Sequence, residues 1–331
     1  MAAIIKVKNL KKYYRVHKKE PGLVGSVKSL FSRKYEQVRA VDGVSFSIDE
    51  GELVGFIGPN GAGKTTTLKC LSGLLYPTDG ETSVLNFNPW HRQAKFLRQI
   101  ALVMGQKNQL WWDLPPMETF LLNKEIYEIP GEQFKKTLDE LVKLLEVDDI
   151  LKIQARKLSL GQRMKCELIA SLLHSPKVLF LDEPTIGLDV VMQKKMRDFI
   201  KEYNRRYQAS IILTSHYMGD VKELCKRVII IDKGKIVFDG QLEKVVKKFA
   251  NYKVLSLVLA KKIDLNKLEK IGQVKEFDFP KAVIIVKRKT APLAAAQILK
   301  EFPVVDLNVE EPPIEDVIRQ VFTGRCVNIG N

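Results

Sequence analysis

From residue 4 to about residue 238, short apolar runs alternate with stretches in which apolar residues recur every three or four positions. Such runs predict buried strands, and such stretches predict helices that pack on a sheet. The predicted strands are Ile4–Val7, Leu53–Ile57, Ala101–Met104, Val178–Leu181, Ser210–Leu213 and Val228–Ile231. The predicted helices are Thr66–Leu71, Gly131–Leu145, Gly161–Leu173, Val191–Arg206 and Asp220–Lys226. This order indicates an α/β fold with a mainly parallel, largely buried sheet.

The pattern changes near Gln241, where a second set of shorter elements begins. It predicts strand 253–259, helix 265–271, strand 274–279, strand 282–287, helix 292–302, strand 304–309 and a last helix 314–322. This order is close to the split βαβ, ferredoxin-like plan of an α+β domain. A chain of 331 residues is also long for one average domain. We therefore expect two domains, residues 1–240 and residues 241–331.

A basic insertion, residues 15–38, interrupts the first domain. Leu23, Val24, Val27, Leu30 and Phe31 recur there at spacings near three and four, beside several Lys and Arg residues. A short basic amphipathic turn of this kind suits a membrane surface or a partner helix, and a plain surface hairpin is an equal alternative. Residues 11–39 carry about half of the net charge of +15. That patch suits anionic lipid, nucleic acid or an acidic partner, or it is a solvated face.

Composition excludes several classes of protein. With 45% apolar and 28% charged residues, the chain has the composition of a folded globular protein. No run approaches the roughly 18–20 apolar residues that cross a bilayer. Lysines interrupt the apolar residues at the N-terminus, so we expect no secretory signal and a cytoplasmic location. Four widely separated cysteines predict reduced structural thiols rather than a zinc site or disulfides: Cys70, Cys166, Cys225 and Cys326.

The segment Leu53–Leu71 has the strand–loop–helix plan of a phosphate-binding loop. Glycines let backbone N–H groups close around phosphate oxygens, and the helix N-terminus adds a favourable dipole. In this plan Lys64 reaches the β- and γ-phosphates, and the Thr65 hydroxyl ligates Mg²⁺. The loop consists of Gly58, Pro59, Asn60, Gly61, Ala62, Gly63, Lys64, Thr65 and Thr66. We therefore expect this loop to bind ATP together with Mg²⁺.

Two carboxylates, Asp182 and Glu183, follow the apolar run Val178–Leu181. Ligands of open α/β sheets gather at the carboxyl ends of the strands. We expect Asp182 to contribute to the Mg²⁺ shell. Glu183 is then placed to accept a proton from, or to orient, the water that attacks the γ-phosphate. Beside the phosphate loop, this interpretation is favoured over a strand that merely ends in solvated acids.

Between these motifs, Leu158-Ser159-Leu160-Gly161-Gln162 resembles the signature motif of the ATP-binding cassette (ABC) ATPases. The motif opens a helix with one apolar face, which leaves Ser159 and the N–H groups near Gly161 outward as an anion site. In the family, Ser159, Gly161 and Gln162 would contact the γ-phosphate of ATP that the opposite subunit holds. The resemblance therefore implies a P-loop NTPase fold and a dimer of cassettes, homomeric or heteromeric, with two shared sites.

Further motifs follow in the order that the family requires. Gln106 resembles the glutamine that contacts Mg²⁺ and water, with Gln109 as second choice, and Gly187-Leu188-Asp189 resembles the dimer-contact loop. His216 resembles the switch histidine that senses the γ-phosphate. Near the N-terminus, Tyr14 resembles the aromatic residue that stacks on adenine, with Tyr13 as second choice.

The resemblance covers residues 4–240 and implies a helical signature subdomain at about residues 107–175. Gln106–Pro115 and the Pro-Gly-Leu of the insertion resemble the ATPases of daunorubicin-type multidrug exporters. Trp111 and Trp112 fall in the stretch that meets the membrane subunit in the family; burial inside the helical subdomain is the alternative. We see no catalytic cluster in the C-terminal accessory domain.

The resemblance implies an ATPase, with Lys64, Glu183 and His216 as catalytic residues, that drives export through separate transmembrane permease subunits. It places the chain peripherally at the cytoplasmic face of the cell membrane. A sugar-type importer ATPase is the alternative, although such proteins usually append small β-barrel domains. A soluble ABC ATPase acting on nucleic acid or ribosomes fits less well, because the chain has one cassette and no sustained heptads. We expect no nucleic-acid partner.

Overall fold

The computed structural model describes residues 3–17, 35–105 and 109–323. The chain forms two compact units, Met1–Asp239 and Gly240–Asn331. The amphipathic turn predicted at residues 23–31 lies outside the described residues, as do Gln106 and Cys326. Three of the four predicted thiols, Cys70, Cys166 and Cys225, are free and buried.

The centre of the larger unit is a six-stranded sheet with the order β5-β6-β7-β3-β8-β9. Neighbouring strands from β5 to β8 run parallel, as the apolar runs predicted. Their residues are almost all buried, which the continuous Val, Ile and Leu runs require. The strands are β3 (Leu53–Ile57), β5 (Ile100–Met104), β6 (Val178–Asp182), β7 (Ser210–Thr214), β8 (Arg227–Asp232) and β9 (Lys235–Gln241).

A second, three-stranded antiparallel sheet has the order β2-β1-β4. The sequence pattern predicted only Ile4–Val7 of this sheet, but the first strand is much longer. The bounds are β1 (Ala3–His17), β2 (Tyr35–Asp49) and β4 (Asp79–Val84). The ends of the predicted insertion are therefore strand, because His17 pairs with Tyr35 and Tyr14 pairs with Val38.

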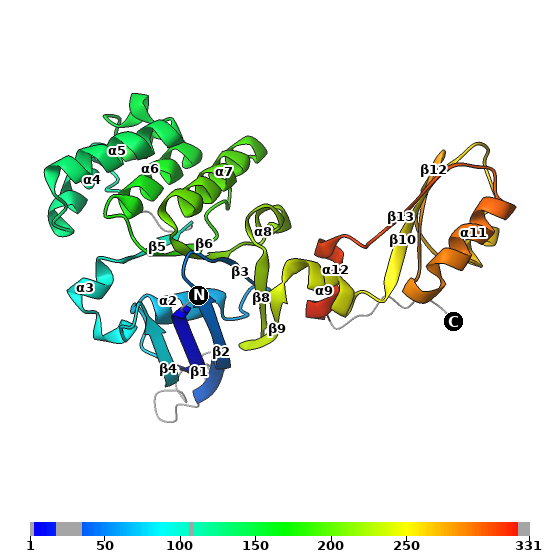
Figure 1. Cartoon of the computed structure of the whole chain (residues 1–331), viewed down its shortest axis with the longest axis horizontal. Helices are drawn as coiled ribbons and strands as arrows, with labels where there is room; N and C mark the ends of the chain where they lie inside the picture. The colour runs from blue at the N-terminus through cyan, green and yellow to red at the C-terminus, as the bar shows by residue number, and fades with distance from the viewer. Residues whose placement is uncertain (1–2, 18–34, 106–108, 324–331) are drawn as a thin grey trace, which may run out of the picture. The chain divides into compact units, whose positions relative to one another are not determined.

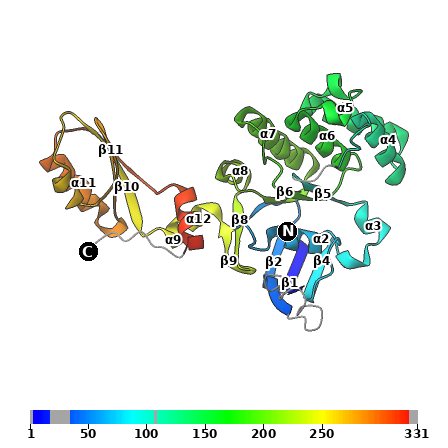
Figure 2. The same ribbon diagram turned by 180° about the vertical axis from the view of Figure 1, so that it is seen from behind.

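Helix α2 (Lys64–Leu71) lies between the two sheets in Figures 1 and 2. Its buried Leu68 and Leu71 join one core with Phe46 of the small sheet and Phe56 of the large sheet. The Phe46 and Phe56 ring centroids are 5.7 Å apart. This packing fixes the start of α2 against the end of β3, where the phosphate loop lies.

The other face of the large sheet carries a layer of helices (Figure 1). Helix α6 is buried over most of its length, and α5 presents its apolar stripe to the core. These helices are α4 (Pro116–Ile126), α5 (Gly131–Leu145), α6 (Leu160–Leu172) and α7 (Val190–Tyr207), with α8 (Met218–Leu224) beside them. Helix α4 was not predicted, because its apolar and polar residues are poorly segregated.

The smaller unit contains a four-stranded antiparallel sheet with the order β11-β12-β10-β13. Together with the helices Leu265–Glu269 and Ala291–Glu301, this order confirms the predicted ferredoxin-like plan. The elements are β10 (Tyr252–Leu259), α10 (Leu265–Glu269), β11 (Gln273–Asp278), β12 (Lys281–Lys287), α11 (Ala291–Glu301) and β13 (Val304–Glu310). An unpredicted helix, α9 (Leu242–Phe249), packs with the last helix, α12 (Ile314–Thr323).

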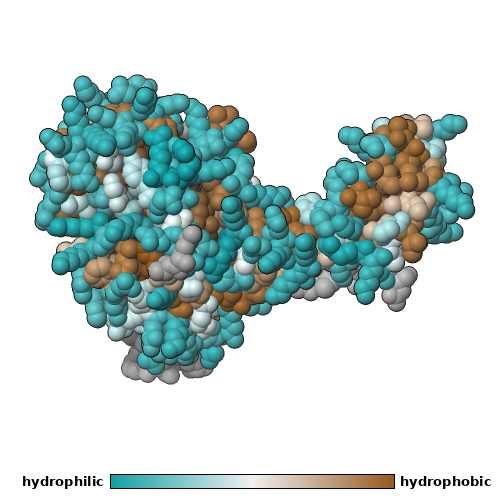
Figure 3. Space-filling model, in the orientation of Figure 1, coloured by the Kyte–Doolittle hydropathy of each residue, from teal (hydrophilic) through white to brown (hydrophobic). Residues whose placement is uncertain are grey.

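On the face seen in Figure 3, hydrophilic residues cover most of both units, and hydrophobic residues gather over part of the smaller one. None of the helices in the described residues combines the length and the apolar character that crossing a bilayer requires.

Candidate active site

The carboxyl ends of three adjacent strands, β6, β7 and β3, carry most of the predicted site residues. The loop 58–63 follows β3, Asp182 ends β6, and His216 follows β7. Because parallel strands end at the same edge of a sheet, residues far apart in the sequence meet there.

The loop after β3 has a backbone that only glycine allows at two positions. Gly63, immediately before α2, has a φ of 109°, and an added Cβ would lie 2.4 Å from the Ala40 carbonyl oxygen. At Gly58 a Cβ would lie 2.2 Å from the Ile231 carbonyl oxygen. The loop therefore packs tightly against its neighbours and leads directly into a helix N-terminus, which attracts anions.

Lys64 begins α2, and its side chain folds back over the loop. The Lys64 Nζ donates hydrogen bonds to the carbonyl oxygens of Gly58 at 2.7 Å and Pro59 at 3.1 Å. Burial lowers the pKa of Lys64, while Glu183 and Asp182 act in the opposite direction. An ammonium group in a poorly solvated place near two carboxylates is suited to hold phosphate.

Asp182 lies between two hydroxyl groups. Its Oδ2 accepts a hydrogen bond from Thr65 Oγ1 at 2.8 Å, and its Oδ1 accepts one from Thr214 Oγ1 at 2.7 Å. The two predicted Mg²⁺ ligands, Thr65 and Asp182, are thus brought together. A hydroxyl and a carboxylate fit Mg²⁺, which takes few protein ligands and completes its octahedron with phosphate and water oxygens.

Glu183 and His216 form the second contact at this edge. The His216 Nε2 lies 2.7 Å from Glu183 Oε1. Glu183 has a left-handed φ of 55°, an unusual conformation for glutamate that functional sites often hold. Its other carboxylate oxygen, Oε2, is buried and has no hydrogen-bond partner among the described residues. A carboxylate with one anchored and one free oxygen is arranged to accept a proton.

Thr214, which the sequence reasoning missed, supports both contacts. Its hydroxyl donates to Asp182, and it accepts a hydrogen bond from the Glu183 N–H at 3.0 Å. The Glu183 N–H also points to the Thr214 carbonyl oxygen at 3.1 Å. The available signal was a polar residue that ends an apolar strand two positions before His216.

Ser159 and Gln162 form a capping box at the start of α6. The Gln162 N–H donates to Ser159 Oγ at 3.2 Å, and the Ser159 N–H donates to Gln162 Oε1 at 2.9 Å. Gly161 is packed, because an added Cβ would lie 3.1 Å from Met192 Cε. The Ser159 side chain is exposed at the helix N-terminus, but it belongs to a different layer from the loop before α2 (Figure 1).

Asp189 caps the start of α7, as Ser159 caps the start of α6. The Asp189 Oδ1 accepts a hydrogen bond from the Met192 N–H at 2.9 Å. Its carboxylate thus caps a helix, a role that the sequence analysis did not include.

The two tyrosines near the N-terminus have different surroundings. The Tyr13 hydroxyl donates to Asp42 Oδ1 at 2.5 Å, and this bond raises the pKa of Tyr13 and lowers that of Asp42. The ring of Tyr14 is 37% exposed, with Lys12 Nζ 5.3 Å from its centroid. Tyr14 therefore has the ring that is available to a base.

Gln106 lies outside the described residues, but Gln109 is described and its amide is engaged. The Gln109 Nε2 donates to the Leu102 carbonyl at 3.0 Å, and its Oε1 accepts from Ser171 Oγ at 2.7 Å. Nearby, Trp111 and Trp112 are 59% and 47% exposed. Of the two alternatives for these tryptophans, burial in the helical layer is therefore wrong.

Comparison with known proteins identifies the family. The model of the ABC transporter family matches residues 41–186, and that of the EvrA-like ABC transporter C-terminal domain matches residues 251–310. The ABC transporter ATP-binding protein NatA of Bacillus subtilis is 33% identical over 213 residues, which are 64% of this chain and 86% of NatA. This chain belongs to the ABC transporter ATP-binding proteins. It is the ATP-binding subunit of an ABC transporter, in a family that hydrolyses ATP.

Relatives in the ABC family differ in the direction of transport that their names state. The linearmycin resistance ATP-binding protein LnrL of Bacillus subtilis is 27% identical over 304 residues, 89% of this chain and 97% of LnrL. The methionine import ATP-binding protein MetN of Geobacillus kaustophilus is 32% identical over 219 residues, 65% of this chain and 64% of MetN. The names of the relatives therefore leave the direction open.

Solved ABC structures have the same cassette fold. A dimeric post-hydrolysis structure of the cassette MJ0796, bound to ADP and Pi, has a TM-score of 0.59 and 25% identity, covering 72% of this chain and 98% of that one. The expected P-loop NTPase fold of the cassette is thereby confirmed.

Proposed function

We propose that this ABC ATPase hydrolyses MgATP at two sites shared between paired cassettes and thereby drives export through separate transmembrane subunits. The observation that carries the proposal is the meeting, at one sheet edge, of Thr65 with Asp182 and of Glu183 with His216. These pairs match the two tasks of phosphoryl transfer to water, which are charge neutralisation and positioning of the nucleophile.

In the proposed mechanism, the backbone N–H groups of residues 60–66 and the Lys64 ammonium bind the phosphates, and Tyr14 stacks on the adenine. Mg²⁺, held by Thr65, Asp182 and Gln106, would neutralise phosphate charge. Glu183 accepts a proton from the attacking water through Oε2, which no described residue binds. His216 holds Glu183 Oε1 and senses the γ-phosphate.

The second half of each site would come from a second cassette. Ser159, Gly161 and Gln162 present a helix N-terminus, which favours negative charge. In the proposal they meet the γ-phosphate bound by the opposite cassette, while Asp189 lies at the contact between the two. The partner is a second copy or a related cassette.

The proposed division of the chain is an ABC domain at residues 1–240, with the basic insertion at 15–38 and a helical signature subdomain at about 107–175, followed by the accessory domain at 241–331. Trp111 and Trp112 are exposed anchors for a transmembrane subunit. This contact would hold the ATPase at the cytoplasmic face of the membrane. We propose no nucleic-acid partner.

Two observations favour export. The chain and LnrL, a resistance ATP-binding protein, match over almost their whole lengths, whereas MetN is matched over 64% of its length. The accessory domain is ferredoxin-like rather than the β-barrel type expected of sugar importers, and it matches the EvrA-like C-terminal domain.

The substitution Glu183→Gln tests the proposed site. We expect steady-state ATP hydrolysis to fall at least about a hundredfold, because the general base is lost. ATP binding should persist, and an ATP-dependent dimer should become visible by gel filtration. Glu81→Gln is the matched control, because Glu81 is an exposed glutamate of β4 whose carboxylate lies 3.7 Å from Lys8 Nζ, its one ion-pair partner in the described part of the chain. Full activity of the Glu183→Gln protein would contradict the proposal.

A further inference from the structure

A fully buried carboxylate, Asp220, lies in α8, four residues after His216. Its exposed fraction is 0%, and no other charged residue in the described part of the chain is buried as completely. Removing a carboxylate from water is costly unless it is both paired and hydrogen-bonded. The partners of Asp220 therefore indicate what the carboxylate is for.

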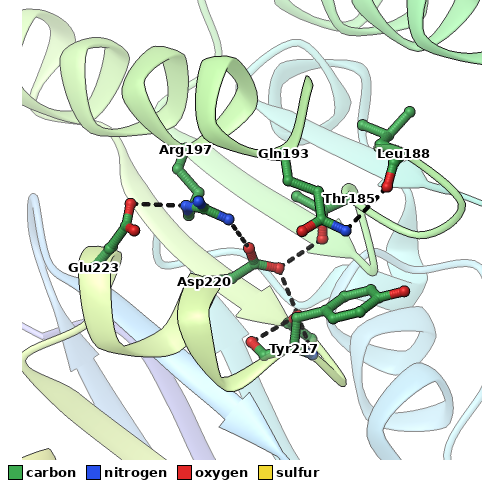
Figure 4. A network of polar contacts seen from close by, with 8 residues as sticks. Thr185, Leu188, Gln193, Arg197, Tyr217, Asp220 and Glu223 are labelled. Carbon is green, nitrogen blue, oxygen red and sulfur yellow. Dashed lines mark hydrogen bonds and ion pairs between the residues drawn. The ribbon is translucent and has the colours of Figure 1, made fainter. Parts of the chain in front are cut away.

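Each oxygen of Asp220 has a distinct set of partners (Figure 4). Oδ2 accepts hydrogen bonds from Thr185 Oγ1 at 2.6 Å and from Ser215 Oγ at 2.7 Å. Oδ1 accepts one from Arg197 Nη1 at 3.0 Å. The Arg197 Nε also donates to Glu223 at 2.7 Å, so the guanidinium compensates the charge of Asp220 and retains a second partner.

The two hydroxyl groups come from the two loops that carry the proposed catalytic pair. Thr185 follows Glu183 by two residues, and Ser215 immediately precedes His216. A single carboxylate oxygen thus joins the loop after β6 to the loop after β7. Ser215 Oγ also accepts a hydrogen bond from the Tyr217 N–H at 3.0 Å, which fixes the backbone on the other side of His216.

The network continues into α7. Arg197 lies on this helix, and Gln193 of the same helix donates to the Leu188 carbonyl at 3.0 Å (Figure 4). Asp189 caps the same helix. Helix α7, which carries Arg197 and is held at its start by the Gln193 and Asp189 contacts, therefore joins the two catalytic loops to the segment that the proposed dimer places at the contact between cassettes.

We infer that Asp220 is a positioning residue for ATP hydrolysis, which acts through Thr185 and Ser215 to hold the two loops at the separation that brings Glu183 and His216 together. The inference rests on the proposed roles of that pair. Buried ion pairs add little net stability compared with apolar groups, so a fixed geometry is the benefit that this arrangement provides. Small displacements of a catalytic group lower the rate strongly, whereas nucleotide binding at the phosphate loop does not require the pair.

The test uses two variants at Thr185 and one at Asp220 of the full-length protein. Thr185→Val keeps the shape and removes the hydroxyl, while Thr185→Ser keeps the hydroxyl. We expect Thr185→Val and Asp220→Asn each to lower kcat for ATP about tenfold or more, with KM for ATP changed less than about threefold. Thr185→Ser should retain kcat within about twofold. Glu223→Gln, at the far end of the network, is the control and should also stay within twofold.

Thermal unfolding of every variant separates positioning from stability. A kcat loss in Thr185→Val with an unchanged Tm supports the inference, because a packing role would not lower kcat in the isosteric variant. Wild-type kcat in both Asp220→Asn and Thr185→Val overturns the inference. It is also overturned if kcat and Tm fall together, and by similar amounts, in both Thr185→Val and Thr185→Ser. The proposed function fails separately, through an active Glu183→Gln protein, and the inference then falls with it.

Discussion

Buried charges at the sheet edge are tolerated because neighbouring hydroxyl groups satisfy them. Asp182 accepts from Thr65 and Thr214, and Asp220 accepts from Thr185 and Ser215. Hydrogen bonds to an ionised carboxylate are stronger than those between neutral groups, and they fix its orientation. At the residue scale, the threonines and serines therefore determine where the carboxylates point.

His174 offers a pH-dependent test of burial in the larger unit. Its ring stacks on Tyr127 with centroids 4.0 Å apart, its Nε2 lies 2.9 Å from the Ile100 carbonyl oxygen, and its Nδ1 is buried without a partner in the described residues. Burial lowers the pKa of His174 below the ordinary value of 6.5, and the hydrogen bond with the Ile100 carbonyl oxygen acts in the opposite direction. The folded protein therefore favours the neutral ring.

The sign of the pH effect follows from proton binding. Below pH 6.5 the unfolded chain takes up a proton at residue 174 that the folded chain resists, so stability is lost as the pH falls. We expect His174→Gln to flatten the decline of Tm between pH 7.5 and 5.5. His91→Gln, at an exposed position, should leave that slope as in the wild type. Parallel slopes for both variants would show that His174 is not the group responsible.

At the scale of elements, helix N-termini supply much of the site. Helix α2 follows the phosphate loop directly, α6 begins at the capping box, and α7 begins at Asp189. The first N–H groups of a helix lack partners within the helix and carry a partial positive charge. Binding an anion and capping the helix therefore compete for the same groups.

Substitution of Ser159 separates these two roles. Ser159→Ala removes the cap and should cost about 1 kcal/mol of unfolding free energy, measured with urea. Ser159→Asp keeps a capping oxygen, so its stability should stay near that of the wild type, yet its charge would repel the γ-phosphate of the opposite cassette. We expect it to lose ATP-dependent dimerisation and hydrolysis. Wild-type hydrolysis by the Asp variant would argue against the signature role.

At the scale of the whole molecule, the division into two compact units separates ATP chemistry from the accessory fold. The smaller unit has its own core, in which Leu257, Ile284 and Ile298 are almost fully buried. Its charged pairs, such as Arg288 with Glu311, lie mostly at the surface and add little stability. In the proposed function, the transmembrane partner meets the larger unit, where Trp111 and Trp112 are exposed.

Affinity capture from membranes tests that partnership. We expect the tagged protein to recover a multi-spanning protein, and a Trp111→Ala, Trp112→Ala double variant to recover less of it. A Trp90→Ala protein is the control for loss of a tryptophan elsewhere. The tagged protein and the recovered membrane protein can then be reconstituted together in vesicles with the ATPase on the outside. If the transporter is an exporter, substrate should accumulate inside these vesicles when ATP is added. Recovery of ribosomes or DNA without a membrane protein would contradict the transporter proposal.

The sequence determined the chemistry and the local elements of this protein, because these depend on neighbouring residues. Glycine positions and the lysine and threonine beside them specify the loop before α2, and apolar periodicity specifies the parallel strands and most helices. The ferredoxin-like order of the smaller unit was predictable for the same reason. Poorly patterned elements were missed: β2, β4, β9, the short helix α3 (Ala94–Leu97), α4 and α9.

Only the tertiary structure decided which side chains meet. Nothing local indicates that Thr214 bridges Asp182 and the Glu183 N–H, because those contacts arise where β6 and β7 end side by side. The network around Asp220 likewise joins residues from two helices and two loops, and a lone aspartate in a helix carries no sign of it. Such contacts depend on strand order and on burial, which raises the cost of every unpaired polar group. The residue types were readable in the sequence, whereas their partners are a property of the fold.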